Sequence, residues 1–144
     1  MKIGFTDQLK MDILSHYFTD NTELYVGLFV NTGQVDNDPV ELVIGTGAGD
    51  YTRKQVSFGV PNGALISNNQ PITWNTASYD WTPNNTVITH LGIFDNDGSN
   101  MPTTGTNPDT LEGLLVFLPL SQSESVLTGN TFVLNTDAIR LQLV

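Results

Sequence analysis

The sequence predicts an all-β protein, a jelly-roll-like β-sandwich of about eight strands with one short N-terminal α-helix. Short segments rich in β-branched and aromatic residues recur along the chain, and clusters of Gly, Pro, Asn and Asp separate them. Apolar residues take helical spacing in one segment only, near the N-terminus. Strands do not alternate with helices, so a parallel α/β sheet is disfavoured.

A chain of 144 residues suits a single domain, which we take as 1–144 with an N-terminal helical segment at 1–20. It contains no cysteine, and a core of this size needs neither a disulfide nor a metal. The longest apolar run, 114–120, is too short for a membrane-spanning helix, which takes about 20 apolar residues. The N-terminus lacks the apolar core of a signal peptide. We therefore expect a soluble protein without a membrane partner.

The predicted helix follows Thr6, whose side chain suits an N-cap, and Asp7 places a negative charge in its first turn. Leu9, Ile13 and Tyr17 recur at every fourth position and form an apolar stripe. A helix this short is stable only when it packs on something else. It either closes one end of the sandwich, which is the interpretation we favour, or docks on a neighbouring subunit.

Residues 87–95 form the clearest predicted strand. Side chains alternate along this segment, and one face is wholly apolar while the other is apolar at both ends. We expect such a strand near the middle of the sandwich. The other strands are predicted at 23–30, 51–58, 65–66, 71–74, 113–120, 125–128, 131–134 and 138–144.

Three of these predictions carry a further expectation. The alternation in 51–58 indicates a strand exposed on at least one face. Pro71 cannot donate to a ladder, so 71–74 is expected at a sheet edge. The two-residue turn Gly129-Asn130 predicts a hairpin between the segments before and after it.

The charge balance excludes two classes of partner. Fifteen acidic residues face five basic ones, for a formal charge of −10. Nucleic-acid binding needs clustered Lys and Arg to displace phosphate counterions. The five basic residues are instead scattered as Lys2, Lys10, Arg53, Lys54 and Arg140. An acidic chain also repels anionic membranes, so we expect neither partner.

The residue pattern does not indicate an enzyme. His16 and His90 are the two side chains with an ordinary pKa near neutral pH, and neither has a nucleophile beside it in the sequence. No Gly-x-Ser-x-Gly nucleophile elbow is present. We therefore predict no catalytic residue and no cofactor.

Two loops have a superficial likeness to ligand sites. The glycines in 45–49 resemble a phosphate-binding loop, but a strand rather than a helix is expected after them, which favours a flexible linker. Asp95 and Asp97 place oxygen ligands at alternate positions, as calcium loops do. The spacing does not fit an EF-hand, and an Asx turn that ends the strand explains the carboxylates without a metal.

Trp74, Tyr79 and Trp81 lie close together in a polar segment. Exposed aromatic residues in such surroundings are typical of carbohydrate or protein contacts. We favour the alternative in which they cap the sandwich core.

Several sequence segments, in this order, resemble those of a known protein family. They are Leu24-Tyr25-Val26-Gly27-Leu28-Phe29, Gly49-Asp50-Tyr51-Thr52-Arg53, Val56-Ser57-Phe58, Ile72-Thr73-Trp74, Thr89-His90-Leu91-Gly92-Ile93-Phe94-Asp95, Gly113-Leu114-Leu115 and Thr128-Gly129-Asn130-Thr131-Phe132. The chain is similar over nearly its whole length to small virion structural proteins of tailed bacteriophages, often labelled tail fibre or minor structural proteins. The resemblance implies a non-enzymatic β-sandwich that assembles on the particle.

Three functions are considered for a protein of this kind. The first is a capsid cement or decoration protein, which lies on the outside of the head and binds the major capsid protein or other virion proteins. The acidic charge and the lack of heptads or fibrous repeats favour this function. We predict this function, with self-association guessed as a trimer. A tail-fibre or baseplate subunit for host attachment is the alternative, and a carbohydrate-binding module is the third. The long polar segments 31–50 and 96–110 are expected to make the contacts.

Overall fold

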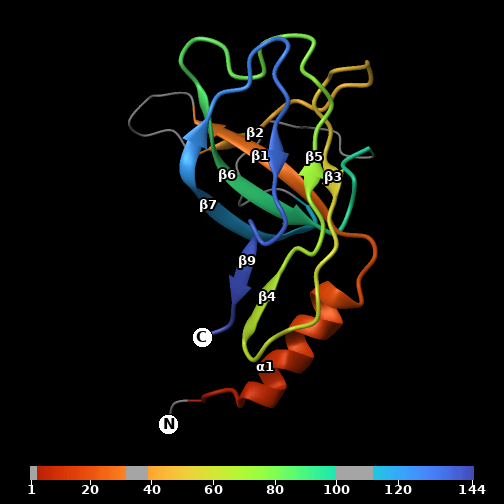
Figure 1. The fold of residues 1–144 in the computed structure, drawn as a ribbon, viewed down its shortest axis with the longest axis vertical. Helices are drawn as coiled ribbons and strands as arrows, with labels where there is room; N and C mark the ends of the chain where they lie inside the picture. The colour runs from red at the N-terminus through yellow and green to blue at the C-terminus, as the bar shows by residue number, and fades with distance from the viewer. Residues whose placement is uncertain (1–2, 32–38, 100–111) are drawn as a thin grey trace.

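The computed structural model describes residues 3–31, 39–99 and 112–144. It is built mostly from antiparallel strands, with one helical segment at the N-terminal end (Figure 1). The strands are β1 (Tyr25–Asn31), β2 (Val40–Glu41), β3 (Lys54–Gln55), β4 (Leu65–Ser67), β5 (Ile72–Thr73), β6 (Val87–Phe94), β7 (Leu114–Glu124), β8 (Val133–Leu134) and β9 (Arg140–Gln142). The predicted class, a β protein with one short helix, is therefore confirmed.

The main sheet has five strands in the order β2-β1-β6-β7, with β3 paired to β1 as well. β6 lies between β1 and β7, which confirms its predicted central place. Leu91 and Ile93, on the predicted wholly apolar face of β6, are buried in the main core, and so is Ile88, because the pairing of β6 is irregular between Ile88 and His90. The opposite face carries Gly92 and Phe94.

The outer edge of β1 is shared by two short strands. β2 pairs with one end of β1, at Phe29 and Val30, and β3 pairs with the other end, at Tyr25 and Val26. Between them the Leu28 carbonyl accepts a hydrogen bond from the Leu42 amide at 3.0 Å. β2 and β3 therefore pair with the two ends of this edge of β1, where a sheet would ordinarily have one continuous strand.

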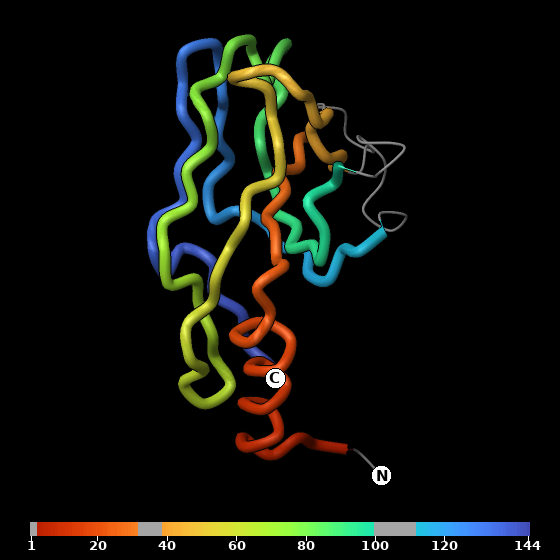
Figure 2. Tube along the Cα trace, turned by 90° about the vertical axis from the view of Figure 1, so that its right-hand side faces the viewer, coloured from red at the N-terminus to blue at the C-terminus, as the bar shows by residue number. Residues whose placement is uncertain are grey.

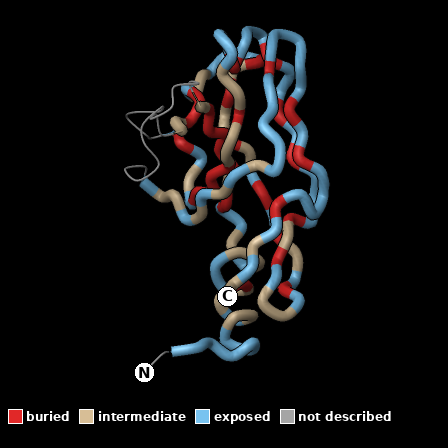
Figure 3. The backbone as a smooth tube through the Cα atoms, turned by 90° about the vertical axis from the view of Figure 1, so that its left-hand side faces the viewer, coloured by how far each residue is buried: buried red, intermediate tan, exposed pale blue. Residues whose placement is uncertain are grey.

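A second layer of two short ribbons faces the main sheet. β4 pairs with β9, and β5 pairs with β8. Figure 2 shows these ribbons, in green and blue, on one side of the molecule and β1 and β6 on the other. The residues between the layers are buried, as the red segments in Figure 3 indicate, and this arrangement is sandwich-like. Buried Asn68 ties the layer together, since its Oδ1 accepts from the Ile139 amide at 2.8 Å.

The helical segment is α1 (Asp7–Leu14) followed by a π-helical turn (Ser15–Thr19). The Thr6 side chain accepts a hydrogen bond from the Leu9 amide at 3.2 Å, as expected of the N-cap. Leu14 is buried, and the Phe18 ring packs edge-on against Phe58 of the core. The helix thus closes one end of the molecule beside β4 (Figure 1). No helix in the described ranges is long and apolar enough to cross a membrane.

Two strand predictions are wrong in detail. The turn at Gly129-Asn130 forms, but it does not join a hairpin, because 125–128 is not a strand and β8 pairs with β5. In 51–58 only β3 is a strand; Gln55 and Ser57 are exposed, but Tyr51 and Arg53 are buried. Their partners come from distant segments, which a local alternation cannot reveal.

Candidate functional site: the Arg53 cluster and two exposed apolar surfaces

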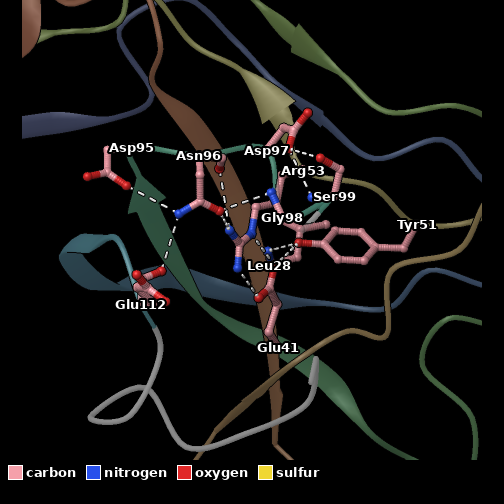
Figure 4. Close-up of polar contacts among 10 residues, drawn as sticks. All are labelled: Leu28, Glu41, Tyr51, Arg53, Asp95, Asn96, Asp97, Gly98, Ser99 and Glu112. Atoms are coloured by element: carbon pink, nitrogen blue, oxygen red, sulfur yellow. Dashed lines mark hydrogen bonds and ion pairs between the residues drawn. The ribbon is translucent and has the colours of Figure 1, made fainter. Parts of the chain in front are cut away.

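The largest group of buried polar side chains surrounds Arg53, just before β3 (Figure 4). Its guanidinium donates two hydrogen bonds to the Glu41 carboxylate of β2, from Nε to Oε1 and from Nη2 to Oε2, each 2.8 Å long. Both side chains are completely inaccessible to solvent. A buried charge is tolerated only when it is paired and hydrogen-bonded, and this two-pronged geometry provides both conditions. We call Glu41, Tyr51, Arg53 and Asn96 the Arg53 cluster.

Tyr51 connects this pair to the main sheet. Its hydroxyl donates to Glu41 Oε1 at 2.8 Å and accepts from the Leu28 amide at 2.9 Å. The hydroxyl thereby occupies the gap that β2 and β3 leave along β1. Burial of the ring raises the pKa of Tyr51 well above the ordinary tyrosine value, and the charge of Glu41 raises it further.

The fourth member of the cluster, Asn96, comes from the turn after β6. Arg53 Nη1 donates to Asn96 Oδ1 at 2.6 Å, and the Gly98 amide donates to the same oxygen at 3.0 Å. The guanidinium carbon also lies 3.4 Å from the centre of the Phe94 ring, so the cation stacks on an aromatic face. One arginine thus joins β2, the segment before β3, and the end of β6.

The arrangement of these groups indicates a structural role rather than catalysis. Among the described residues, every buried side-chain nitrogen and oxygen has a hydrogen-bond partner. Arg53, Glu41 and Tyr51 are closed to solvent, and half-buried Asn96 is bonded to Arg53 and Gly98, so these groups are occupied by one another. Of the segments predicted to make contacts, 31–50 and 96–110, residues 32–38 and 100–110 lie outside the described residues.

The turn after β6 accounts for the carboxylates that resemble a calcium loop. Asp97 Oδ1 accepts hydrogen bonds from the Ser99 amide at 2.9 Å and the Ser99 hydroxyl at 2.6 Å. These bonds lower the pKa of Asp97. Asp95 Oδ1 accepts from Asn96 Nδ2 at 3.2 Å. The bond from the Ser99 amide to Asp97 forms the expected Asx turn. In the described part of the chain, no group of three or more acidic or histidine side chains is arranged to hold a metal ion.

The two histidines lie far apart in the fold and have different surroundings. His16 is exposed on the helical segment, with its ring edge-on to Tyr17. His90 is half-buried on β6, where its ring stacks on Phe117 at 4.7 Å and Nδ1 lies 2.8 Å from the Thr89 hydroxyl. Burial lowers the pKa of His90.

The glycine loop and the aromatic residues also have structural explanations. In 45–49, the Gly47 amide donates to Asp50 Oδ2 at 2.7 Å, and no helix follows the loop. Trp74 and Trp81 are buried and donate their indole N–H groups to the Thr52 and Gly49 carbonyls. Tyr79 alone of the three is exposed. The burial of both tryptophans favours the interpretation in which they cap the core.

Two apolar surfaces remain exposed in the described part of the chain. The first, the helix stripe, consists of Leu9, Ile13 and Tyr17; Leu9 and Tyr17 are exposed and Ile13 is half-buried. The second is β7, the last strand of the main sheet, where Leu115 and Phe117 are exposed. Apolar surface of this kind on a folded protein is typical of sites that contact other proteins.

Sequence reasoning missed the Arg53 cluster. One signal was present: Glu41 is the single charged residue in the apolar run 40–44, and a carboxylate in such a run requires a buried partner. The partner's identity could not be inferred, because Arg53 is separated from it by the loop 45–50.

A family model described as "Podophage GP4 fiber I protein gp80" matches residues 4–142. A search of curated proteins finds no match. The family match covers nearly the whole chain, including the helix, both layers and the Arg53 cluster.

Proposed function

This chain belongs to the family of the podophage GP4 fiber I protein gp80, and we infer from that membership that it serves as a subunit of a phage tail fibre. At the coarser level, it is a fibre-type structural protein of a phage virion. The family description supports the tail-fibre alternative better than the capsid cement function that the sequence favoured. The description of the family is the observation that carries this proposal.

The fold supports a structural subunit in a second way. Its buried polar groups bind one another: Arg53 binds Glu41, and Asn68 holds the chain around Ile139. Such fully paired buried networks fix one arrangement of the backbone. A rigid block with exposed apolar surfaces suits a part that is built into a larger assembly. We therefore expect its partners to be other structural proteins of the virion.

Locating the protein in intact particles tests the proposal. Gold-labelled antibody against the purified chain, viewed by electron microscopy, should mark the tail of each virion. Quantitative mass spectrometry of the same particles should give far fewer copies of this chain than of the major capsid protein. Label spread over the head, with a copy number close to that of the capsid protein, would instead support the cement function and overturn the proposal.

A further inference from the structure

β7 ends the main sheet, and no described strand pairs with its outer side. It is also the longest strand, and its first seven residues, 114–120, are all apolar. Proteins usually protect an edge strand with charged side chains, bulges or covering segments, because its unpaired backbone groups invite pairing with another chain. Residues 113–123 contain no charged side chain at all. This edge therefore lacks the usual charge protection against strand pairing.

Hydrogen bonds elsewhere in the sheet fix which backbone groups face outward. Leu28 directs its amide and carbonyl away from β6, to Tyr51 and Leu42. Leu28 lies opposite Leu91, and Leu91 lies opposite Leu118. Backbone groups alternate in direction along a strand, so Leu91 and Leu118 bond to each other, and the next residue, Phe117, points its amide and carbonyl outward. A donor and an acceptor at Phe117 thus face away from the sheet.

The side chains near Phe117 are placed to continue the sheet. Val116 and Leu118 pack against the main core but are only half-buried, so a neighbouring strand would cover them further. Phe117 lies on the opposite face, where its ring contacts Phe29 edge-on at 5.0 Å and remains 37% exposed. Pro119, which has no amide to donate, comes two residues later and limits how far pairing can extend beyond Phe117.

We propose that β7 pairs in antiparallel fashion with β7 of a second copy of this chain, about a two-fold axis at Phe117. The two Phe117 residues then exchange two backbone hydrogen bonds, and Val116 of each copy lies opposite Leu118 of the other. This pairing joins two main sheets into one continuous sheet.

The uncharged, wholly apolar sequence of 114–120 favours a second copy as the occupant. Each copy carries a formal charge of −10, so most approaches between copies bring carboxylates together. Pairing through 114–120 brings two uncharged, wholly apolar segments together instead. The segment is apolar on both sides of Phe117. A two-fold axis at Phe117 therefore places residues 114–116 of one copy opposite the apolar residues 118–120 of the other.

The mass of the purified full chain in solution is the first test. Sedimentation equilibrium should show a reversible change from the 15.7 kDa chain to a species of twice that mass. Because a two-fold interface closes at two copies, the dimer should not grow further at higher concentration. A protein that stays monomeric at the highest concentrations reached, or that forms trimers, overturns the proposal.

Charge variants at Phe117 test the register. Phe117→Lys should weaken dimerisation by roughly a hundredfold, because like charges across an interface are strongly unfavourable. Phe117→Glu should do the same, and an equimolar mixture of the two variants should dimerise again, since residue 117 faces itself across the axis. If the mixture stays monomeric, the axis is not at Phe117. Circular dichroism checks that each variant is folded, and Leu115→Lys, at an exposed position of the same strand, replaces any variant that is not.

Leu9→Lys is the matched control. It places the same charge on a similarly exposed leucine of the helix stripe, and it should leave the dimer intact. A dimer that is lost with Leu9→Lys but kept with Phe117→Lys would assign the interface to the helix stripe instead. The inference deepens the proposed fibre function but does not depend on it. It is tested on purified protein, whereas the tail location is tested on particles, so either can fail alone.

Discussion

Gly27 of β1 lies directly opposite Gly92 of β6, and together they make room for two phenylalanine rings on that face of the sheet. A Cβ atom on Gly27 would lie 2.7 Å from Cε2 of Phe94, and one on Gly92 would lie 2.7 Å from Cε2 of Phe29. The two rings are parallel, with centroids 6.2 Å apart. The Phe94 ring in turn supports the Arg53 guanidinium, so the glycine pair underlies the whole cluster.

Gly27→Ala should therefore destabilise the fold. The added methyl group would also come within 2.9 Å of Glu41 Oε1, so both the ring and the carboxylate must move. Overpacking of this kind costs about 1–3 kcal/mol of the free energy of unfolding. Urea unfolding followed by tryptophan fluorescence measures the loss. Gly59→Ala is the control, because its Cβ would make only ordinary contacts, the nearest at 3.7 Å; equal losses in both variants would contradict this explanation.

Arg53→Gln should cost about 3–5 kcal/mol of unfolding free energy, because it leaves the buried Glu41 carboxylate without its cation. The double variant Glu41→Met/Arg53→Met removes both charges and should recover most of that loss. Chemical denaturation of the single and double variants provides the comparison. If the double variant is as unstable as the single one, the hydrogen bonds to Tyr51 and Asn96 carry the stability instead. Lys10→Met, at the 4.0 Å contact with the exposed Asp7 carboxylate, should change little.

Tyr51 should make stability fall at alkaline pH. Its pKa is raised in the fold, so above the ordinary tyrosine pKa of about 10 the unfolded chain loses a proton that the folded chain keeps. The contribution is fully present below that pH and declines as the pH rises toward the folded-state pKa. Urea unfolding at pH 9 and pH 11 should show a smaller fall for Tyr51→Phe than for the natural chain. The variant should also be less stable at pH 7 by about 1–3 kcal/mol, because Leu28 and Glu41 each lose a partner.

His90 should have the opposite effect at acid pH. Burial lowers its pKa in the fold, so as the pH falls through the ordinary histidine value of about 6.5 the unfolded chain takes up a proton first. This contribution to stability is present above that pH and is lost as the pH falls toward the folded-state pKa. His90→Gln should reduce the loss of stability between pH 7 and pH 5, as measured by thermal unfolding. In a His16→Gln background, the single remaining imidazole signal in NMR gives the pKa of His90 directly.

Strand positions could be predicted from the sequence where burial follows a local pattern. β6 is apolar at every core-facing position, and its central place follows from that pattern alone. The predicted hairpin at Gly129 was wrong, because a turn signal shows where the chain reverses but not which strand the following segment pairs with. The Arg53 cluster could not be predicted, because its members come from residues 41, 51, 53 and 96 and meet only in the folded sheet. In 51–58, the alternation predicted a strand with an exposed face but could not indicate that Arg53 is buried, because its burial depends on Glu41 from a distant segment.

The span of the Arg53 cluster along the chain bears on how slowly the protein unfolds. The guanidinium can leave water only after β2 and the turn after β6 have come together, because Glu41 and Asn96 bind it, and Tyr51 connects Glu41 to β1. Because these partners are far apart in the sequence, we expect the cluster to form late in folding, so that it slows unfolding and leaves the folding rate almost unchanged. The cluster would then contribute mainly to kinetic stability, that is, to a slow unfolding rate. For a protein carried on a particle that persists outside the cell without chaperones, a long unfolding half-life matters more than the equilibrium free energy.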